Sequence, residues 1–288
     1  MINRKYKDSV FTALFSAPAV LRGLYCALAG VSLPQDVPVS INTLENVLYM
    51  DLYNDISFEI GGKLVILVEH QSTLNPNLAL RFLLYLARVL ERKVKGRSLY
   101  SSKKLSIPSP EFYVLYNGRE SCPDEQVLKL SDLFEKPQDL GLPEKVYPLL
   151  ELEVKVININ EGRNSAVINR CKELAEYSAF MGKIQAFHKE LGNREEAVNK
   201  AVKYCRKNDI LNEFLELYAT EVLNMLLEEW NMDDAIAFAR EEAREDGREE
   251  GREEGREEGC QHVLNLLNQG LTIDEIRQQL EIEQCARS

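Results

Sequence analysis

The spacing of hydrophobic and polar positions changes along the chain, and each change predicts a different element. Over residues 8–30 the apolar residues recur every three or four positions, which predicts a helix interrupted at Pro18. Over residues 44–68, β-branched and aromatic residues flank Gly61 and Gly62, a dipeptide typical of a tight hairpin turn, and predict a pair of strands. Helical spacing returns over residues 78–94, after a favourable helix start at Asn75-Pro76.

Two further strands and then a helical region follow. Residues 111–116 and 152–159 are short apolar runs that predict buried strands. Residues 165–230 predict helices only, with a break at Gly192-Asn193 and an end near Trp230. We therefore expect an α/β fold with a mixed central sheet over residues 1–162, followed by an all-helical region over residues 163–238.

The last fifty residues have a different character. Residues 240–259 repeat Arg-Glu-Glu-Gly, which places Arg and Glu within reach of each other on a helix. Each Gly costs a helix up to about 1 kcal/mol relative to Ala, so residues 239–260 predict a marginal helix or a solvated linker. Residues 261–288 hold two short amphipathic segments, 262–267 and 272–280, which predict a small hairpin for packing or oligomerisation rather than a complete helix-turn-helix.

The amino-acid composition does not exclude a nucleic-acid partner, although the net charge is negative. The net charge is −11, but residues 240–259 alone hold ten acids against five arginines, so the charge does not argue against a nucleic-acid partner. The six cysteines include no CxxC pair and are expected to be reduced thiols. No apolar run approaches the roughly 20 residues that span a bilayer. We expect a cytoplasmic protein without a membrane partner, and a homo-oligomer is left open.

Two acids near the outer ends of the predicted hairpin carry the candidate chemistry. A three-residue turn centred on Gly62 puts Asp55 opposite Glu69, whereas a two-residue turn shifts this register by one. Strand alternation puts Gln71 on the same face as Glu69. Buried paired acids need a counter-charge, and Mg²⁺ supplies it, with the carbonyl of His70 as a third ligand and water activated against a phosphodiester. In the plainer alternative, Asp55 lies in a turn and Glu69 at a solvated strand end.

A family resemblance favours the metal site. Residues 44–88, LENVLYMDLYNDISFEIGGKLVILVEHQSTLNPNLALRFLLYLAR, resemble the signature of the recombination-promoting nuclease and putative transposase family, a branch of the PD-(D/E)XK superfamily. The segments YKDSVF at residues 6–11 and EFYVLYNG at residues 111–118, and the Arg-Glu-Glu-Gly tail, also match. The resemblance implies an αβββαβ core, with Asp55 and Glu69 binding Mg²⁺, for which Mn²⁺ can substitute.

The chain departs from the superfamily pattern at two positions. The superfamily usually has Lys two places after the Glu, where this chain has Gln71. Gln can orient water or phosphate, but it carries no charge and cannot act as a general base. Asn54 replaces a proline that binds no metal. The resemblance therefore implies a DNA endonuclease associated with recombination or mobile elements; the alternative is a catalytically weak or inactive DNA-binding or assembly protein on the same fold.

Basic residues after the site are candidates for DNA binding. Arg81, Tyr85 and Arg88 share one face of the predicted helix and could face the scissile phosphate. Further cations follow on the same stretch of chain with a single acid among them: Arg92, Lys93, Lys95, Arg97, Lys103 and Lys104. This stretch predicts a contact with the DNA backbone. The alternatives are the exposed side of an amphipathic helix and a solvated basic loop.

Overall fold

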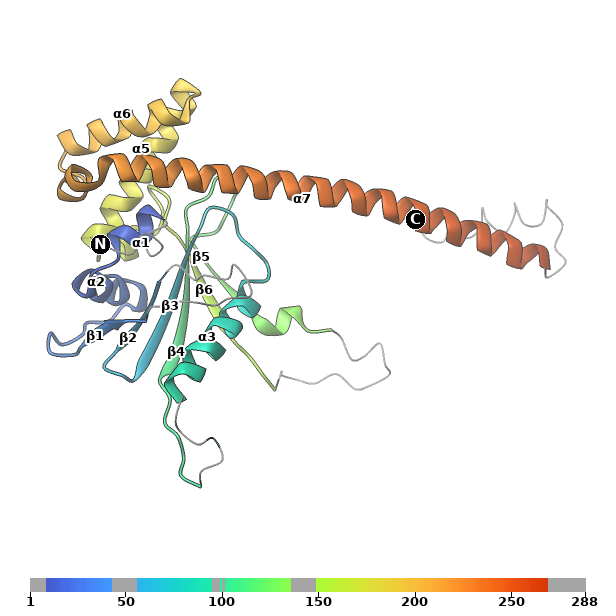
Figure 1. Cartoon of the computed structure of the whole chain (residues 1–288), viewed down its shortest axis with the longest axis horizontal. Helices are drawn as coiled ribbons and strands as arrows, with labels where there is room; N and C mark the ends of the chain where they lie inside the picture. The colour runs from blue at the N-terminus through green and yellow to red at the C-terminus, as the bar shows by residue number, and fades with distance from the viewer. Residues whose placement is uncertain (1–8, 43–55, 95–98, 100–101, 136–148, 269–288) are drawn as a thin grey trace. The chain divides into compact units, whose positions relative to one another are not determined.

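The computed structural model describes residues 9–42, 56–94, 99, 102–135 and 149–268 (Figure 1). By their contacts the residues divide into two compact units, Met1–Glu229 and Trp230–Ser288. The first unit contains the described sheet and the helices up to residue 207, together with the beginning of the last helix. The boundary expected near Gly162 therefore falls inside one compact unit.

The N-terminal segment forms two helices, as predicted. Helix α1 (Val10–Leu14) is capped by Ser9, whose hydroxyl accepts a hydrogen bond from the Thr12 amide at 3.1 Å. Helix α2 (Pro18–Ala29) begins at Pro18, because proline is tolerated in the first turn, where its missing N–H has no partner to lose. The short strand β1 (Val39–Ile41) follows and was not predicted.

The hairpin has the register that a three-residue turn requires. Strands β2 (Ile56–Ile60) and β3 (Leu64–Gln71) are antiparallel, and the residue numbers of each facing pair, from Ile60 and Leu64 to Ile56 and Val68, add up to 124. Gly61 and Gly62 have φ angles of 58° and 65°, in the left-handed region that glycine adopts without strain. The two-residue alternative is thereby excluded.

The remaining strands complete a mixed six-stranded sheet. The elements that follow the hairpin are α3 (Leu78–Val94), β4 (Ser109–Tyr116), β5 (Glu125–Lys129), the short 3₁₀ turn η2 (Leu130–Leu133) and β6 (Glu153–Asn158). The strand order is β1-β2-β3-β4-β6-β5; the β3–β4 and β4–β6 pairs are parallel and the other pairs antiparallel. The expected α/β class with a PD-(D/E)XK-like core is confirmed, and α3 has the predicted bounds.

The sheet is covered on both faces, and β3 lies at its centre (Figure 1). On one face, Val65 and Leu67 pack with Phe82 of α3 in a core that also includes Phe112 of β4. On the opposite face the His70 ring stacks on Phe11 and lies beside Tyr177 of helix α5 (Lys172–Leu191). Alternation along β3 thus separates the odd-numbered side chains, which face α3, from the even-numbered ones.

The last C-terminal helix is longer than predicted. After α4 (Ser165–Ile168) and α5, Gly192 with φ 68° ends α5 and Asn193 caps α6 (Arg194–Lys207), which confirms the predicted break. Helix α7 (Asn212–Asn268) continues past Trp230, so the predicted end there is wrong. Helix α7 includes the whole Arg-Glu-Glu-Gly repeat, for which the sequence predicted a marginal helix or a linker. The segment 272–280 lies outside the described residues.

No helix within the described ranges combines the length and the apolar character that a membrane crossing requires.

Candidate metal and nucleic-acid site

Glu69 is a buried acid on the central strand. It stands near the end of β3, between β2 and β4, and is only 1% exposed. A carboxylate withdrawn from water to this extent is stable only with a counter-charge and hydrogen-bond donors. The side chains around Glu69 therefore have to supply this charge and these donors.

The side chains of Gln71 and Arg81 contact the Glu69 carboxylate from the α3 face of the sheet. The Gln71 Nε2 amide donates a hydrogen bond to Oε2 at 3.0 Å, and Arg81 Nη2 forms an ion pair with Oε1 at 3.4 Å. Strand alternation brings Gln71 to this face, as predicted, and Arg81 comes from the first turn of α3. The Arg81 side chain is 25% exposed, so its guanidinium lies between the buried Glu69 carboxylate and the solvent.

Tyr85 lies one helical turn beyond Arg81 and is completely buried, at 0% exposure. Its hydroxyl accepts a hydrogen bond from Arg81 Nη2 at 3.1 Å. Burial, followed by the negative charge of Glu69, raises the pKa of Tyr85 to about 12, so the phenol stays protonated at neutral pH. A side chain with no exposed surface offers none to DNA, and in this structure the Tyr85 hydroxyl contacts Arg81; a DNA contact by Tyr85 stays a prediction.

Replacing Tyr85 with Phe should lower the free energy of unfolding by about 1.5–3 kcal/mol, because a buried hydrogen bond to a charged group is lost. Urea denaturation measures this change. The matched control is Tyr204→Phe in α6, where the side chain is 39% exposed and the loss should be close to zero. Equal effects at the two positions would contradict the role given to the Tyr85 hydroxyl.

The basic stretch after Arg81 lies at the other end of α3. Lys93 forms an ion pair with Glu59 of β2 at 2.7 Å, and an Nη1 atom of Arg88 is buried without a hydrogen-bond partner in the described part of the chain. Eleven residues of helix, from Arg81 to Arg92, span about 16 Å. Lys95 and Arg97 lie outside the described residues. A DNA contact by this stretch stays a prediction, with the charge of Lys93 already paired.

The residues expected to bind metal are only partly described. Asp55 lies outside the described residues. The His70 ring points to the opposite face of the sheet from Glu69, and burial lowers its pKa to about 4, so the ring is neutral at pH 7. Its backbone carbonyl remains the candidate ligand. Within the described ranges no three His, Cys, Asp or Glu residues form a metal-holding group.

The donor set that is described fits a hard divalent cation. The Glu69 carboxylate is an oxygen donor on the α3 face of β3, with the Gln71 side chain beside it, and Mg²⁺ and Mn²⁺ prefer oxygen ligands. Because the Gln71 amide nitrogen already donates to Glu69, its oxygen is oriented away from that contact. The second carboxylate in this scheme is Asp55.

Comparison with known protein families shows which family the chain belongs to. A family model described as "Putative transposase, YhgA-like" matches residues 41–203, which is more than half of the 288 residues. The chain belongs to this family. No curated protein and no solved structure matches it. The matched range contains the hairpin and α3, and with them Glu69, Gln71 and Arg81.

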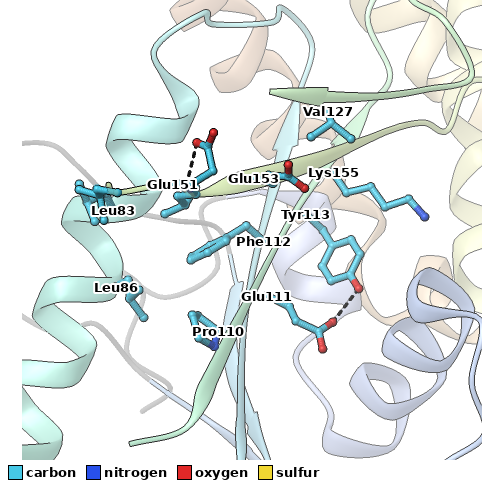
Figure 2. Close-up of a pocket in the computed structure, with 12 residues that line it drawn as sticks. Leu83, Leu86, Pro110, Glu111, Phe112, Tyr113, Val127, Glu151, Glu153 and Lys155 are labelled. Atoms are coloured by element: carbon cyan, nitrogen blue, oxygen red, sulfur yellow. Dashed lines mark hydrogen bonds between the residues drawn. The ribbon is translucent and has the colours of Figure 1, made fainter. Parts of the chain in front are cut away.

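A pocket of about 540 Å³ in this YhgA-like chain lies away from Glu69 (Figure 2). It is found near the starts of β4 and β6, whereas Glu69 is near the end of the parallel strand β3. Figure 2 shows Glu111 turned toward Tyr113, whose hydroxyl donates to it at 2.8 Å. Leu83, Leu86 and Phe112 make much of the wall apolar. The rest of the lining includes the charged residues Glu111, Glu151, Glu153 and Lys155, so the pocket is a separate feature from the Glu69 site.

The sequence analysis missed a loop beside the site. The amide of Asn117 donates to the Gln71 carbonyl at 3.1 Å, so the chain that leaves β4 touches the end of β3. A side chain on Gly118 would lie 1.8 Å from the Ser72 carbonyl oxygen, which means that only glycine fits there. The sequence showed Asn117-Gly118 only as the end of a strand. Its contact with β3 depends on the pairing of β3 with β4, which residues close together in the chain do not predict.

Proposed function

We propose that the chain is a metal-dependent DNA endonuclease of the recombination or mobile-element type. One observation carries the proposal: Glu69, an acid with 1% exposure on the central strand, has its carboxylate in contact with Gln71 and Arg81. Replacing a whole buried ion pair with packed apolar residues is often neutral or stabilising, so an ion pair kept at this position points to a role other than stability. The YhgA-like family description, with its reference to transposition, supports an action on DNA.

Three residues hold the metal in this proposal. The described register ends at the pair of Ile56 and Val68, and extending it by one pair would bring Asp55 opposite Glu69. The Glu69 and Asp55 carboxylates and the His70 carbonyl are the ligands, and oxygen donors of this kind suit Mg²⁺, for which Mn²⁺ can substitute. When bound, such an ion lowers the pKa of water and polarises a phosphoryl oxygen.

In this proposal, Gln71 and Arg81 together perform the role that one lysine has in the superfamily, which is to position the water and to stabilise charge on the phosphate. Gln71 orients the attacking water or a phosphate oxygen through its amide, but it supplies no charge. Arg81, in contact with the same carboxylate and 25% exposed, supplies a fixed positive charge toward the phosphate that is cleaved. The guanidinium cannot give up its proton, so it stabilises charge and does not act as a base.

The alternative is a DNA-binding or assembly protein on the same fold. The observation that favours it is the neutral contact at Glu69, where Gln71 stands in place of a lysine. In this version Glu69 and Arg81 form a structural ion pair, and DNA is bound without being cut.

Supercoiled plasmid incubated with the purified protein tests the proposal. We expect nicked or linear product with Mg²⁺ or Mn²⁺ and none with EDTA. An Asp55→Ala variant separates the alternatives, because the endonuclease loses cleavage while a binding protein has no cleavage to lose and keeps its DNA affinity. Cleavage that persists in EDTA, or in the Asp55→Ala variant, would contradict a metal site at these residues.

A further inference from the structure

The loop over residues 117–120 is held rigidly against the strand that carries Glu69. Its carbonyl groups accept hydrogen bonds at three positions: Asn117 from Gln185 at 3.2 Å, Gly118 from Asn160 at 3.0 Å and Glu120 from Tyr116 at 3.0 Å. The Asn117 amide is bound to Gln71, as described above. With its backbone fixed on both sides, the loop presents the Arg119 side chain from a set position.

Arg119 is exposed and lies beside a second basic group. Its Nη2 atom is 3.0 Å from Nδ1 of His188 in α5, and within the described ranges it forms no ion pair with an acid. Two acids near the loop pair with other cations, Asp124 with Arg163 and Glu161 with Lys183, and the exposed Glu120 follows Arg119 in the chain.

The electrostatic environment of His188 agrees with an excess of positive charge. Its pKa is lowered first by burial and then by the charges of Arg119 and Arg194. No acid is among the causes of this shift. Two guanidinium groups therefore act on one imidazole at the end of the sheet, which is the kind of surface that attracts a phosphate.

We propose that Arg119, with His188 beside it, binds a phosphate of the DNA backbone next to the site at Glu69. The inference rests on the proposed action on DNA, and it deepens that proposal by placing a contact on the loop after β4. The chain connects the two sites directly, because Asn117 is bound to Gln71 and Gln71 to Glu69. The backbone of the duplex then crosses the end of the sheet, from Arg81 to Arg119.

The test is DNA binding by the full-length protein without cleavage. Fluorescence anisotropy with a labelled duplex, in EDTA and at several salt concentrations, compares the wild type with Arg119→Ala. Loss of one phosphate contact lowers affinity about eightfold at 0.1 M salt and reduces the slope of log K against log salt by about one. The loss should be the same for duplexes of different sequence, and Arg119→Lys should restore most of the affinity.

The matched control is Arg206→Ala in α6, which removes the same charge from an exposed arginine paired with Glu216 at 3.6 Å. It should leave affinity and slope unchanged. Equal weakening in both variants, unchanged binding by Arg119→Ala, or no binding by the wild type would each overturn the inference. Normal binding by Arg119→Ala with intact metal-dependent cleavage overturns this contact alone, whereas weakened binding without any cleavage by the wild type overturns the nuclease alone.

Discussion

Changing Glu69 to Gln should reduce metal-dependent cleavage of DNA more than about 100-fold, while the protein remains folded. Substitutions of groups that merely support metal ligands already cost about 10- to 100-fold, and a lost ligand costs more. Gln keeps the shape of the side chain at a position with 1% exposure, so the packing of β3 is preserved. Single-turnover cleavage of a supercoiled plasmid in Mg²⁺ measures the rate.

Glu125→Gln is the control variant, because it also replaces one strand glutamate with Gln, on β5 instead of β3. Glu125 is exposed and pairs with Lys155 at 3.2 Å, far along the sheet order from β3. Its rate should stay within about twofold of the wild type, because surface ion pairs contribute little. If Glu69→Gln cleaved as fast as Glu125→Gln, Glu69 would have no part in catalysis.

The largest effect on stability is expected for Phe82→Ala. Phe82 is 0% exposed in α3 and packs against Phe112 with ring centroids 5.4 Å apart. Removing a buried Phe costs about 3–5 kcal/mol from the lost burial and the cavity that remains. Because Arg81 precedes it on the same helix, the variant should also loosen the contact with Glu69. Equilibrium urea denaturation measures the free energy of unfolding.

Leu84→Ala provides the comparison on the same helix. Leu84 is 40% exposed, and its truncation should cost less than about 1 kcal/mol. Similar losses in the two variants would mean that α3 does not pack on the sheet through Phe82.

Local sequence signals predicted the part of the fold that carries the site. Glycines at 61 and 62 located the hairpin turn and left two registers, of which the structure has the three-residue one, and alternation along β3 placed Gln71 beside Glu69. The apolar spacing after Asn75 located α3, which has the predicted bounds. These features depend on residues close together in the chain, and for that reason a single sequence suffices to infer them.

Features that depend on distant parts of the chain were not predictable in the same way. Strand β1 has three residues and β5 alternates at the sheet edge, so neither gives a strong apolar signal. Tyr85 was expected at the DNA because its spacing from Arg81 is known from sequence, whereas its burial depends on the sheet beneath it. Helix α7 passes through glycines that local propensity disfavours, so the spacing of the repeat left a helix and a linker both open.

The most direct test of the metal site is a titration of the protein with Mn²⁺, followed by calorimetry or by electron paramagnetic resonance of the free ion. Wild-type protein should bind Mn²⁺, and Glu69→Gln should bind it at least about tenfold more weakly, since a charged oxygen ligand is lost. Equal binding by the two proteins, or no binding by the wild type, would contradict the assignment of Glu69 as a metal ligand.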